Sequence, residues 1–486
     1  MNYKMMGRFI AQILSLEGIF MLPALTISVH LGEHPAIRGF AATIVILLAI
    51  SAALRMLCRG AKSNFYATDG MVCVALSWII LSLTGCLPFV ISREIPKFID
   101  ALFEIVSGFT TTGASILPAV ENLSKGILYW RSFSHWVGGM GVLVFLLAIV
   151  PSGERGKGFT MHLLRAESPG PSVGKLVPRM RKTAAILYIL YGILTVANIL
   201  FLLLGGMPAF EAVCNAFGTA GTGGFGVRND SFASYSPYLQ NVTTVFMFLF
   251  GVNFSCYYLL LIGQVRSVLK DEELRAYFGI AFVSIALIAW NIRSLYGTVG
   301  ETLRHAAFQV SSIMTTSGFA TTDFDLWPSF SKTILLVLMV IGASAGSTGG
   351  GIKVARVLLL FKSLRRSFLQ MLHPSRVQLV RNNDQVVDEK VVESTNAYLI
   401  AYVFILFLSF LVLSLDGFST GTNFSAVLCC FNNIGPGLEA VGPTCNFSGF
   451  SVLSKLVLIT DMLLGRLEIF PILCLLSRHT WRRQVK

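Results

Sequence analysis

The sequence is poor in charged residues. Asp, Glu, Lys and Arg make up only 13% of the 486 residues, whereas a soluble globular domain has about 25%. Hydrophobic residues make up 54%. Apolar runs long enough to cross a bilayer, which needs about 20 residues, recur along the whole chain. This composition excludes a soluble domain of useful size and predicts an integral membrane protein with many spans.

Motifs for disulfides, metal binding and catalysis are also missing. The nine cysteines form no CxxC pair and show no regular spacing, and most lie in apolar runs, where a thiol behaves as a small hydrophobe. No nucleophile with a neighbouring base, and no cluster of carboxylates, stands out, so we expect no enzyme. The first apolar stretch has no small-residue cleavage site and is predicted to be a retained transmembrane helix.

The excess positive charge lies between the hydrophobic runs. A net charge of +13 could indicate nucleic-acid binding if it formed one basic surface. Instead, the basic residues form short clusters that alternate with predicted spans, which the positive-inside rule identifies as cytoplasmic loops. We therefore expect both termini in the cytoplasm and no nucleic-acid partner. The clusters lie at Arg55, Arg59 and Lys62, at Arg155 to Lys182, at Arg266 to Arg275, at Lys353 to Arg381 and at Arg478 to Lys486.

The hydrophobic pattern predicts an all-α protein of ten transmembrane spans. Apolar runs at 9–29 and 37–57 form a helical hairpin in a first domain, residues 1–60. A unit then occurs four times: a long apolar helix, a shorter semi-polar helix with a Gly/Thr-rich end, a second long helix and a basic loop. We assign these pore repeats to residues 61–160, 161–270, 271–380 and 381–486. Their long helices are expected at 69–91 and 126–150, 183–205 and 238–263, 276–296 and 330–362, and 395–415 and 449–477.

The shorter helices are too short and too polar to cross a membrane, so we interpret them as re-entrant pore helices. Non-helical backbone at membrane depth is tolerated only where protein buries it or where it lines a water-filled cavity. Four such segments around one axis would form a central pore. They lie at 99–112, 209–220, 301–317 and 421–434.

A small motif that ends in glycine follows each short helix. Backbone carbonyls can replace the water of a dehydrated cation, and glycine allows the close approach of four backbones. One such motif could be an ordinary Gly/Thr-rich loop, but four at matching positions predict a selectivity filter. The second register is open among Gly221, Gly223 and Gly224; we choose Gly221 because its distance from Phe210-Glu211 matches the other repeats. The motifs are Thr111-Thr112-Gly113, Thr219-Ala220-Gly221, Thr316-Ser317-Gly318 and Asn433-Ile434-Gly435.

Five segments carry a family resemblance: FEIVSGFTTTGAS, MTTSGFATTDFDLWP, GASAGSTGGGIK, FNNIGPGLEAVGP and DMLLGRLEIFP. With them the chain resembles the Trk/Ktr/HKT superfamily of K⁺ transporters, specifically the bacterial Trk transmembrane subunit, over nearly its whole length. The resemblance implies K⁺ uptake across the bacterial inner membrane with K⁺ bound at the filter, no organic cofactor, a homodimer in membrane lipid and a cytosolic nucleotide-binding regulatory ring.

Two questions about transport stay open in the sequence. The K⁺-binding membrane subunit of an ATP-driven pump is the alternative, although the N-terminal hairpin and the basic loops favour the Trk type. Transport could be channel-like or coupled to H⁺ or Na⁺. Because the four motifs differ and none is TVGYG, we expect loose selectivity with passage of Rb⁺ and some Na⁺. We expect the regulatory partner to carry an acidic surface. This surface should dock on the basic segments from Arg155 to Lys182 and from Lys353 to Arg381.

The second long helix of the third repeat contains a glycine-rich interruption. Five glycines between residues 342 and 351 cost about 1 kcal/mol each in helix propensity, so the helix should break at membrane depth. A nucleotide-binding loop would need GKS or GKT, which is absent. We predict a loop that lines the cavity below the filter, and the resemblance implies that it is a gate. The gate residues are Gly342, Gly346, Ser347, Thr348, Gly349, Gly350 and Gly351.

Arg466 is the most notable charge in a predicted span. It lies about 18 residues, or roughly 27 Å, from the start of the last helix. Its side chain could snorkel to the headgroups or face a water-filled cavity. The GRLE context resembles the family position of a positive charge below the filter, so we favour the pore-facing alternative. Glu468 is two residues away and should point elsewhere.

Other ionisable groups near the predicted pore helices have two interpretations. Glu104 and Glu211 could attract cations, or they could complete hydrogen-bond networks behind the filter, which we favour. His135 and His305 have no metal-ligand spacing around them, and we expect packing or interfacial roles.

Overall fold

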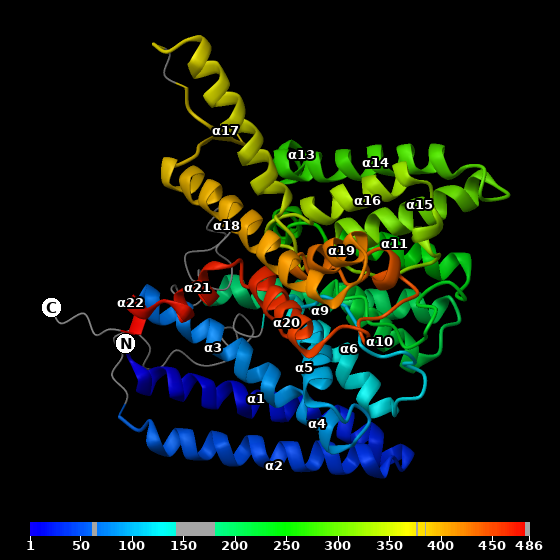
Figure 1. The fold of residues 1–486 in the computed structure, drawn as a ribbon, viewed down its shortest axis with the longest axis vertical. Coiled ribbons are helices and arrows are strands. Elements are labelled where there is room, and N and C mark those ends of the chain that lie inside the picture. The colour runs from blue at the N-terminus through cyan, green and yellow to red at the C-terminus, as the bar shows by residue number, and fades with distance from the viewer. Residues whose placement is uncertain (61–65, 142–179, 376–377, 384, 482–486) are drawn as a thin grey trace.

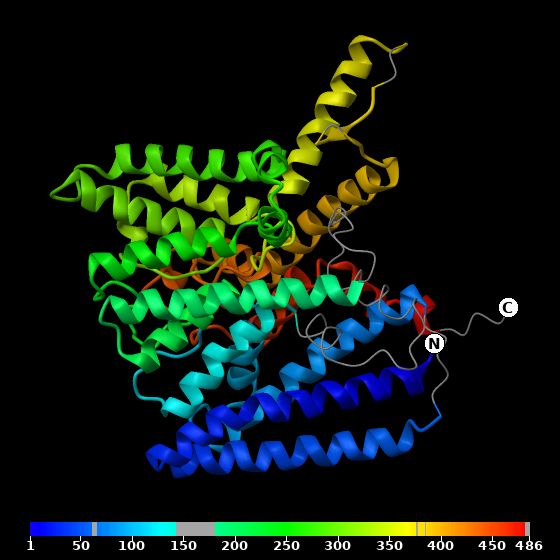
Figure 2. The ribbon, with the colours of Figure 1, turned by 180° about the vertical axis from the view of Figure 1, so that it is seen from behind.

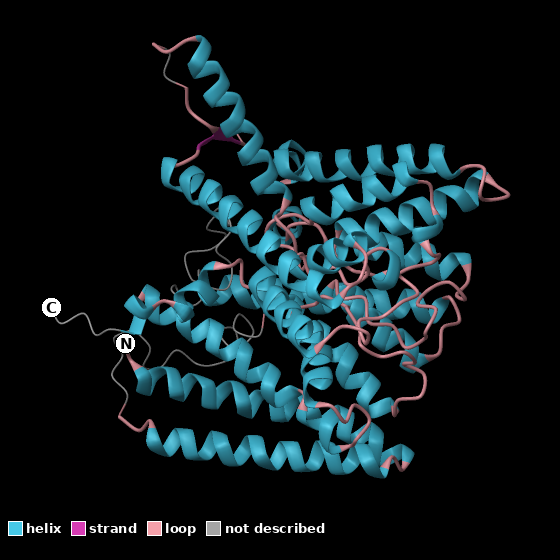
Figure 3. Cartoon of the chain, viewed as in Figure 1, coloured by secondary structure: helices cyan, strands magenta, loops and turns pink. Residues whose placement is uncertain are grey.

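The computed structural model describes residues 1–60, 66–141, 180–375, 378–383 and 385–481. Helices make up nearly all of its regular structure, as Figure 3 shows. Within the described part the only strands are β1 (Arg381–Asn382) and β2 (Gln385–Val386), which pair antiparallel in a small hairpin. The predicted all-α class is confirmed. The basic segment from Arg155 to Lys182 lies almost entirely outside the described residues.

The N-terminal hairpin consists of α1 (Tyr3–Leu31) and α2 (His34–Leu57). Gly32 ends α1 with a φ of 71°, a left-handed conformation that glycine adopts without steric cost. Pro35 follows in the first turn of α2, where proline is favoured because its missing N–H would have no helical partner. Helix α2 lies at the edge of the molecule, at the bottom of Figure 1. Several of its large apolar side chains are exposed, Val45 at 66%, as expected for a surface that lipid covers.

The rest of the chain repeats one order of elements. A long helix comes first each time: α3 (Ala67–Gly85, continued by α4, Leu87–Ile91), α9 (Met180–Leu204), α14 (Glu272–Ile292) and α18 (Glu389–Leu413). A short, largely buried helix follows: α5 (Phe98–Phe109), α10 (Ala209–Gly221), α15 (Val299–Met314) and α19 (Thr420–Phe431). A third helix completes the set: α6 (Lys125–Gly139), α11 (Pro237–Phe250), α16 (Ser329–Ile341) and α20 (Val452–Arg466).

The remaining elements lie between these sets, within them or after the last one. They are α12 (Phe254–Leu261), α13 (Val265–Lys270), α17 (Val354–Leu372), α21 (Phe470–Leu476), α22 (Arg478–Trp481) and the 3₁₀ turns η1 (Phe324–Leu326), η2 (Ser414–Asp416) and η3 (Glu439–Val441). Helix α17 extends away from the body of the molecule, at the top of Figure 1.

All four third helices end early, whereas we expected an interruption only in the third repeat. Helices α6, α11, α16 and α20 have 15, 14, 13 and 15 residues. After α11, the chain turns by 88° into α12 across Gly251, and Asn253 caps the new helix by accepting from Ser255 N. After α20, Glu468 and Ile469 have φ values of 56° and 69°, which no helix contains. The predicted uninterrupted helices at 238–263 and 449–477 are therefore wrong, and the span at 126–150 extends beyond the described residues.

Six described helices are long and apolar enough to cross a membrane, or seven if the bent pair α11 and α12 counts as one span. The protein is thus a multi-pass membrane protein. The number of ten spans stays a prediction, because each third helix alone is too short for the length test and, within the described residues, only α11 passes it when it is joined to α12.

The third helices connect the four sets in a closed cycle. Each packs on the short helix of its own set and on that of the next: α6 on α5 and α10, α11 on α10 and α15, α16 on α15 and α19, and α20 on α19 and α5. Figures 1 and 2 show the two sides of the body that these helices form. The first and last described helices, α1 and α22, meet near their outer ends, since the rings of Tyr3 and Trp481 stack with centroids 6.4 Å apart.

Candidate functional site

The backbone takes the same conformation after each of the four short helices. One residue adopts a left-handed φ between 54° and 59°, and a glycine two residues later has a φ between 74° and 97°. A left-handed conformation costs an ordinary L-residue about 1–2 kcal/mol, so four occurrences indicate one turn built four times. The pairs are Thr111 and Gly113, Thr222 and Gly224, Thr316 and Gly318, and Asn433 and Gly435.

This geometry corrects the register of the second segment. The predicted residues Thr219, Ala220 and Gly221 form the last turn of α10, and the equivalent of the other three motifs is Thr222-Gly223-Gly224. Our register used Phe210-Glu211 as a marker, but Glu211 precedes Thr222 by eleven residues, whereas Glu104 precedes Thr111 by seven. The marker pair therefore lies one helical turn too early in α10. The Thr-x-Gly spacing of 222–224 was the signal that would have given the correct register.

The four glycines interlock the segments into a closed ring. A Cβ atom on any of them would overlap or press on a backbone carbonyl oxygen of the following segment, and the fourth segment meets the first. No side chain fits at these four positions, so the backbones of neighbouring segments are in direct contact. The result is a buried, uncharged ring rich in carbonyl oxygens. The contacts are Gly113 with Gly223 O, Gly224 with Ser317 O, Gly318 with Ile434 O, and Gly435 with Thr112 O.

Glu104 braces the first two segments from behind. Its carboxylate is fully buried and lies 2.5 Å from Nε of Arg131 in α6. It also accepts from Ile116 N at 2.9 Å. Arg131 in turn donates to Gly226 O at 3.0 Å and covers the ring of Phe225 at 3.5 Å. Because its charge is buried and paired, Glu104 supports the fold rather than attracting cations, as we favoured.

His135 has a similar bracing position. One ring nitrogen, Nδ1, lies 2.8 Å from Gly108 O, and the other accepts from Phe225 N at 3.2 Å. His305 is paired with the Thr321 hydroxyl at 2.9 Å. Both histidines are buried packing residues, as expected.

Glu211 lies in a more open environment than Glu104. It pairs with Arg228 at 3.0 Å and accepts from the Tyr235 hydroxyl at 2.5 Å. Glu211 and Arg228 border a cavity of about 510 Å³ that Glu121 and Lys125 also line. Glu211 thus ties the first turn of α10 to the chain after the second segment.

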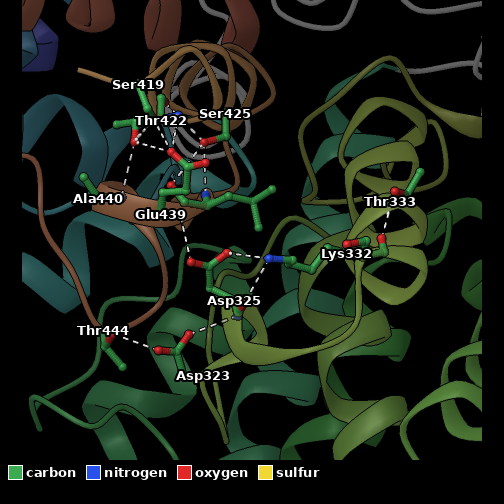
Figure 4. Close-up of polar contacts among 12 residues, drawn as sticks. Asp323, Asp325, Lys332, Thr333, Ser419, Thr422, Ser425, Glu439, Ala440 and Thr444 are labelled. Carbon is green, nitrogen blue, oxygen red and sulfur yellow. Dashed lines mark hydrogen bonds and ion pairs between the residues drawn. The ribbon is translucent and has the colours of Figure 1, made fainter. Parts of the chain in front are cut away.

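A polar cluster joins the chain after the third segment to the chain after the fourth. Figure 4 shows Asp325 between Lys332 and Glu439. Its carboxylate lies 3.4 Å from the Lys332 amine and accepts from Glu439 N at 3.1 Å. Hydrogen bonds from Ser419 and Thr422 at the start of α19 lower the pKa of Glu439. The charged carboxylate therefore caps the positive end of this short helix.

The glycine-rich interruption lies directly against the ring, on the side where the third helices end. Gly350 N donates to the Thr316 hydroxyl at 2.7 Å. Ser344 N donates to Gly251 O at 3.1 Å, which joins the loop to the break after α11. The predicted break at 342–351 is confirmed, and the non-helical segment, which we call the glycine loop, spans residues 342–353.

Arg466 points under the ring and does not snorkel. It is the last residue of α20, and its guanidinium donates to Gly138 O, to Gly139 O at 2.7 Å and to Thr348 O at 3.0 Å. The Thr111 hydroxyl lies 3.4 Å away. One side chain from the fourth set therefore contacts the first segment, the end of α6 and the glycine loop.

Glu468 does not neutralise Arg466, as predicted from their spacing. It forms an ion pair with Arg356, in the first turn of α17. The guanidinium of Arg356 also lies 4.3 Å from the ring centre of Tyr398. Sequence reasoning did not find this pair, because its members are 112 residues apart.

Comparison with known proteins gives consistent matches over almost the full length. The family model of TrkH, described as a cation transport protein, matches residues 36–481. The Trk system potassium uptake protein TrkH of Salmonella typhimurium is 35% identical over 490 residues, 99% of this chain and 100% of that protein. TrkG of Escherichia coli, with the same description, is 33% identical over 474 residues, 96% of each chain.

A solved structure agrees with these matches. The crystal structure of the potassium transporter TrkH from Vibrio parahaemolyticus superimposes with a TM-score of 0.88 at 32% identity and covers 99% of this chain and 100% of that one. The resemblance inferred from the five sequence segments is confirmed. The chain belongs to the TrkH family of cation transport proteins, which are membrane transporters and not enzymes.

Proposed function

We propose that this protein takes up potassium ions across the bacterial inner membrane through a central pore that the four segments line. The observation that carries the proposal is the closed ring of glycine-to-carbonyl contacts. Four copies of one turn surround a single axis, and the glycine of each copy contacts a backbone carbonyl oxygen of the next. The relatives described as potassium uptake proteins support K⁺ as the transported ion.

The ring provides the chemistry that a dehydrated K⁺ requires. Carbonyl oxygens replace its hydration shell, and no fixed charge in the ring binds the ion too tightly to let it leave. The first, third and fourth segments keep the residues predicted from the sequence, and the second uses 222–224. Because each segment has a different sequence, its carbonyls are held differently, which supports loose selectivity that admits Rb⁺ and some Na⁺.

The wider architecture follows from the same proposal. Four repeats and the N-terminal hairpin make ten spans, the basic clusters face the cytoplasm, and both termini lie there. The protein forms a homodimer and is regulated by a cytosolic nucleotide-binding partner. The segment from Lys353 to Arg381 supports such docking, because α17 extends from the body and carries several basic residues.

Potassium uptake can be tested in a bacterium that lacks its own uptake systems. We expect the chain, expressed with its regulatory partner, to restore growth at low external K⁺. Purified protein in ATP-free vesicles should carry K⁺ and Rb⁺ down their gradients. Flux that requires ATP hydrolysis by a phosphorylated partner would instead favour the pump subunit.

Within this proposal, the glycine loop is the gate, and a bulky residue at Gly346 should raise resting K⁺ flux about tenfold. Gly346 has a φ of 70°, and a Cβ there would lie 2.9 Å from the Asn253 amide oxygen. A leucine therefore strains the closed loop by about 1–2 kcal/mol, which corresponds to roughly a tenfold shift in population. Flux into vesicles and bilayer recording measure the change, and the K⁺/Na⁺ ratio should stay as in the wild type.

Gly263→Leu is the matched control for this prediction. Gly263 also has a left-handed φ, 79°, but nothing lies within 4 Å of its Cβ position. It should carry similar backbone strain and leave gating unchanged. Equal flux in the wild type and Gly346→Leu, together with normal regulation, would rule out the loop as the gate.

A further inference from the structure

We propose that two carboxylates, Glu273 and Glu468, hold the glycine loop closed, so that opening the pore requires both to release it. The inference rests on the proposed role of the loop as a gate. It adds the two residues that fix the closed state, which lie outside the loop in two different parts of the fold.

Glu273 binds both ends of the loop with one oxygen atom. It is the second residue of α14, and its side chain is buried. Oε1 accepts from Ala345 N at 2.5 Å and from Ala355 N at 3.2 Å. Ala345 lies near the start of the glycine loop and Ala355 just after its end. One oxygen atom that accepts from both ends of the loop holds the loop in a compact shape.

Glu468 holds the end of the loop through Arg356. Its ion pair with Arg356 is largely buried, with side-chain exposures of 12% and 6%. Arg356 lies three residues after the loop ends, so the pair fixes the position where α17 starts. Removing one partner of such a buried pair destabilises the closed state because the other charge is left uncompensated.

The two carboxylates belong to elements outside the loop. Glu273 belongs to the first helix of the third set, and Glu468 lies in the break after α20, two residues beyond Arg466. Lys353, by contrast, donates to Gly349 O within the loop itself, and that contact can travel with it. The loop can therefore leave the ring only after the contacts to Ala345, Ala355 and Arg356 have broken.

The test measures resting Rb⁺ flux into vesicles that contain the protein alone, together with the K⁺/Na⁺ ratio. Glu273→Ala should raise resting flux about tenfold or more, since it removes two buried hydrogen bonds from the closed state. Glu273→Gln keeps one carbonyl oxygen that can accept these hydrogen bonds, so its flux should lie between that of the wild type and that of Glu273→Ala. The ion ratio should stay unchanged in both.

Glu272→Ala is the matched control. Glu272 precedes Glu273 in the same helix end and pairs with Lys362 rather than with the loop. Both substitutions remove one carboxyl group from the start of α14. If the loss of any carboxyl group there raised the flux, both variants would show the same increase. We expect wild-type flux from Glu272→Ala.

The second clamp is tested with the double variant Arg356→Met and Glu468→Met. Replacing both charges by apolar residues of similar size usually preserves folding, so this variant remains informative if Glu273→Ala does not fold. We expect raised resting flux from it. Wild-type flux in either Glu273→Ala or the double variant, with selective transport retained, would overturn the clamp but leave the pore. Absence of selective flux in the wild type would overturn the proposed function itself.

Discussion

Gly318→Ser is expected to reduce the K⁺/Na⁺ permeability ratio by at least tenfold. Gly318 has a φ of 74°, and a Cβ there would overlap Ile434 O, one of the four ring carbonyls. Serine must push this oxygen away, so one quarter of the ring no longer fits a dehydrated K⁺. A loss of about 1.4 kcal/mol of preference is a factor of ten. Reversal potentials in bilayers measure the ratio, and Gly113→Ser should behave in the same way.

Gly226→Ser is the control for this substitution. Gly226 follows the second segment, its φ is not left-handed, and the nearest atom to its Cβ position is 3.6 Å away. The K⁺/Na⁺ ratio of Gly226→Ser should match that of the wild type.

Gly224→Ser should resemble Gly318→Ser. Gly221→Ser should instead lower the yield of folded protein, because its Cβ would overlap the backbone of His135. An unchanged ratio in both Gly318→Ser and Gly224→Ser would remove these glycines from the filter.

Arg466→Ala is expected to raise K⁺ flux by an order of magnitude. A fixed positive charge about 10 Å from an ion, at an effective dielectric constant near 20, costs roughly 1.7 kcal/mol, which corresponds to more than tenfold in rate. The substitution also frees Thr348 O in the glycine loop. Single-channel recordings separate the two effects. Loss of the charge should change the current through the open pore, whereas loss of the loop contact should change the open probability.

Arg466→Lys provides the comparison. Lysine keeps the charge but cannot form the same fork of hydrogen bonds. If the charge dominates, its conductance should stay close to that of the wild type. Equal flux through the wild type, Arg466→Lys and Arg466→Ala would contradict a position under the ring.

The positions of most helices could be predicted because the membrane imposes a simple pattern on the sequence. Helices α14 and α18 read as apolar runs of sufficient length, and the short helix α15 stands out because it is both shorter and more polar. The register of the second segment was missed for a local reason. An aromatic residue followed by an acid occurs at 103–104 and again at 210–211, but the two pairs lie at different distances from the left-handed residue that follows their helix.

Breaks in the third helices were harder to predict. Five glycines in ten residues identify the interruption after α16, whereas the turn after α11 depends on a single Gly251 and the cap of Asn253. The break after α20 has no glycine at all, since Glu468 and Ile469 adopt left-handed conformations. Tertiary contacts, here the ion pair with Arg356, hold these strained residues. Such contacts join positions far apart in the sequence, and no local pattern reveals them.

The most direct test of a cation pore through the ring is to locate the ion. Crystals grown in thallium(I), which replaces K⁺ and scatters anomalously, should show a peak on the axis between the carbonyl oxygens of Thr112, Gly223, Ser317 and Ile434. Crystals of Gly318→Ser should show a weaker or displaced peak. Thallium bound elsewhere in the protein, with no density inside the ring, would contradict the account.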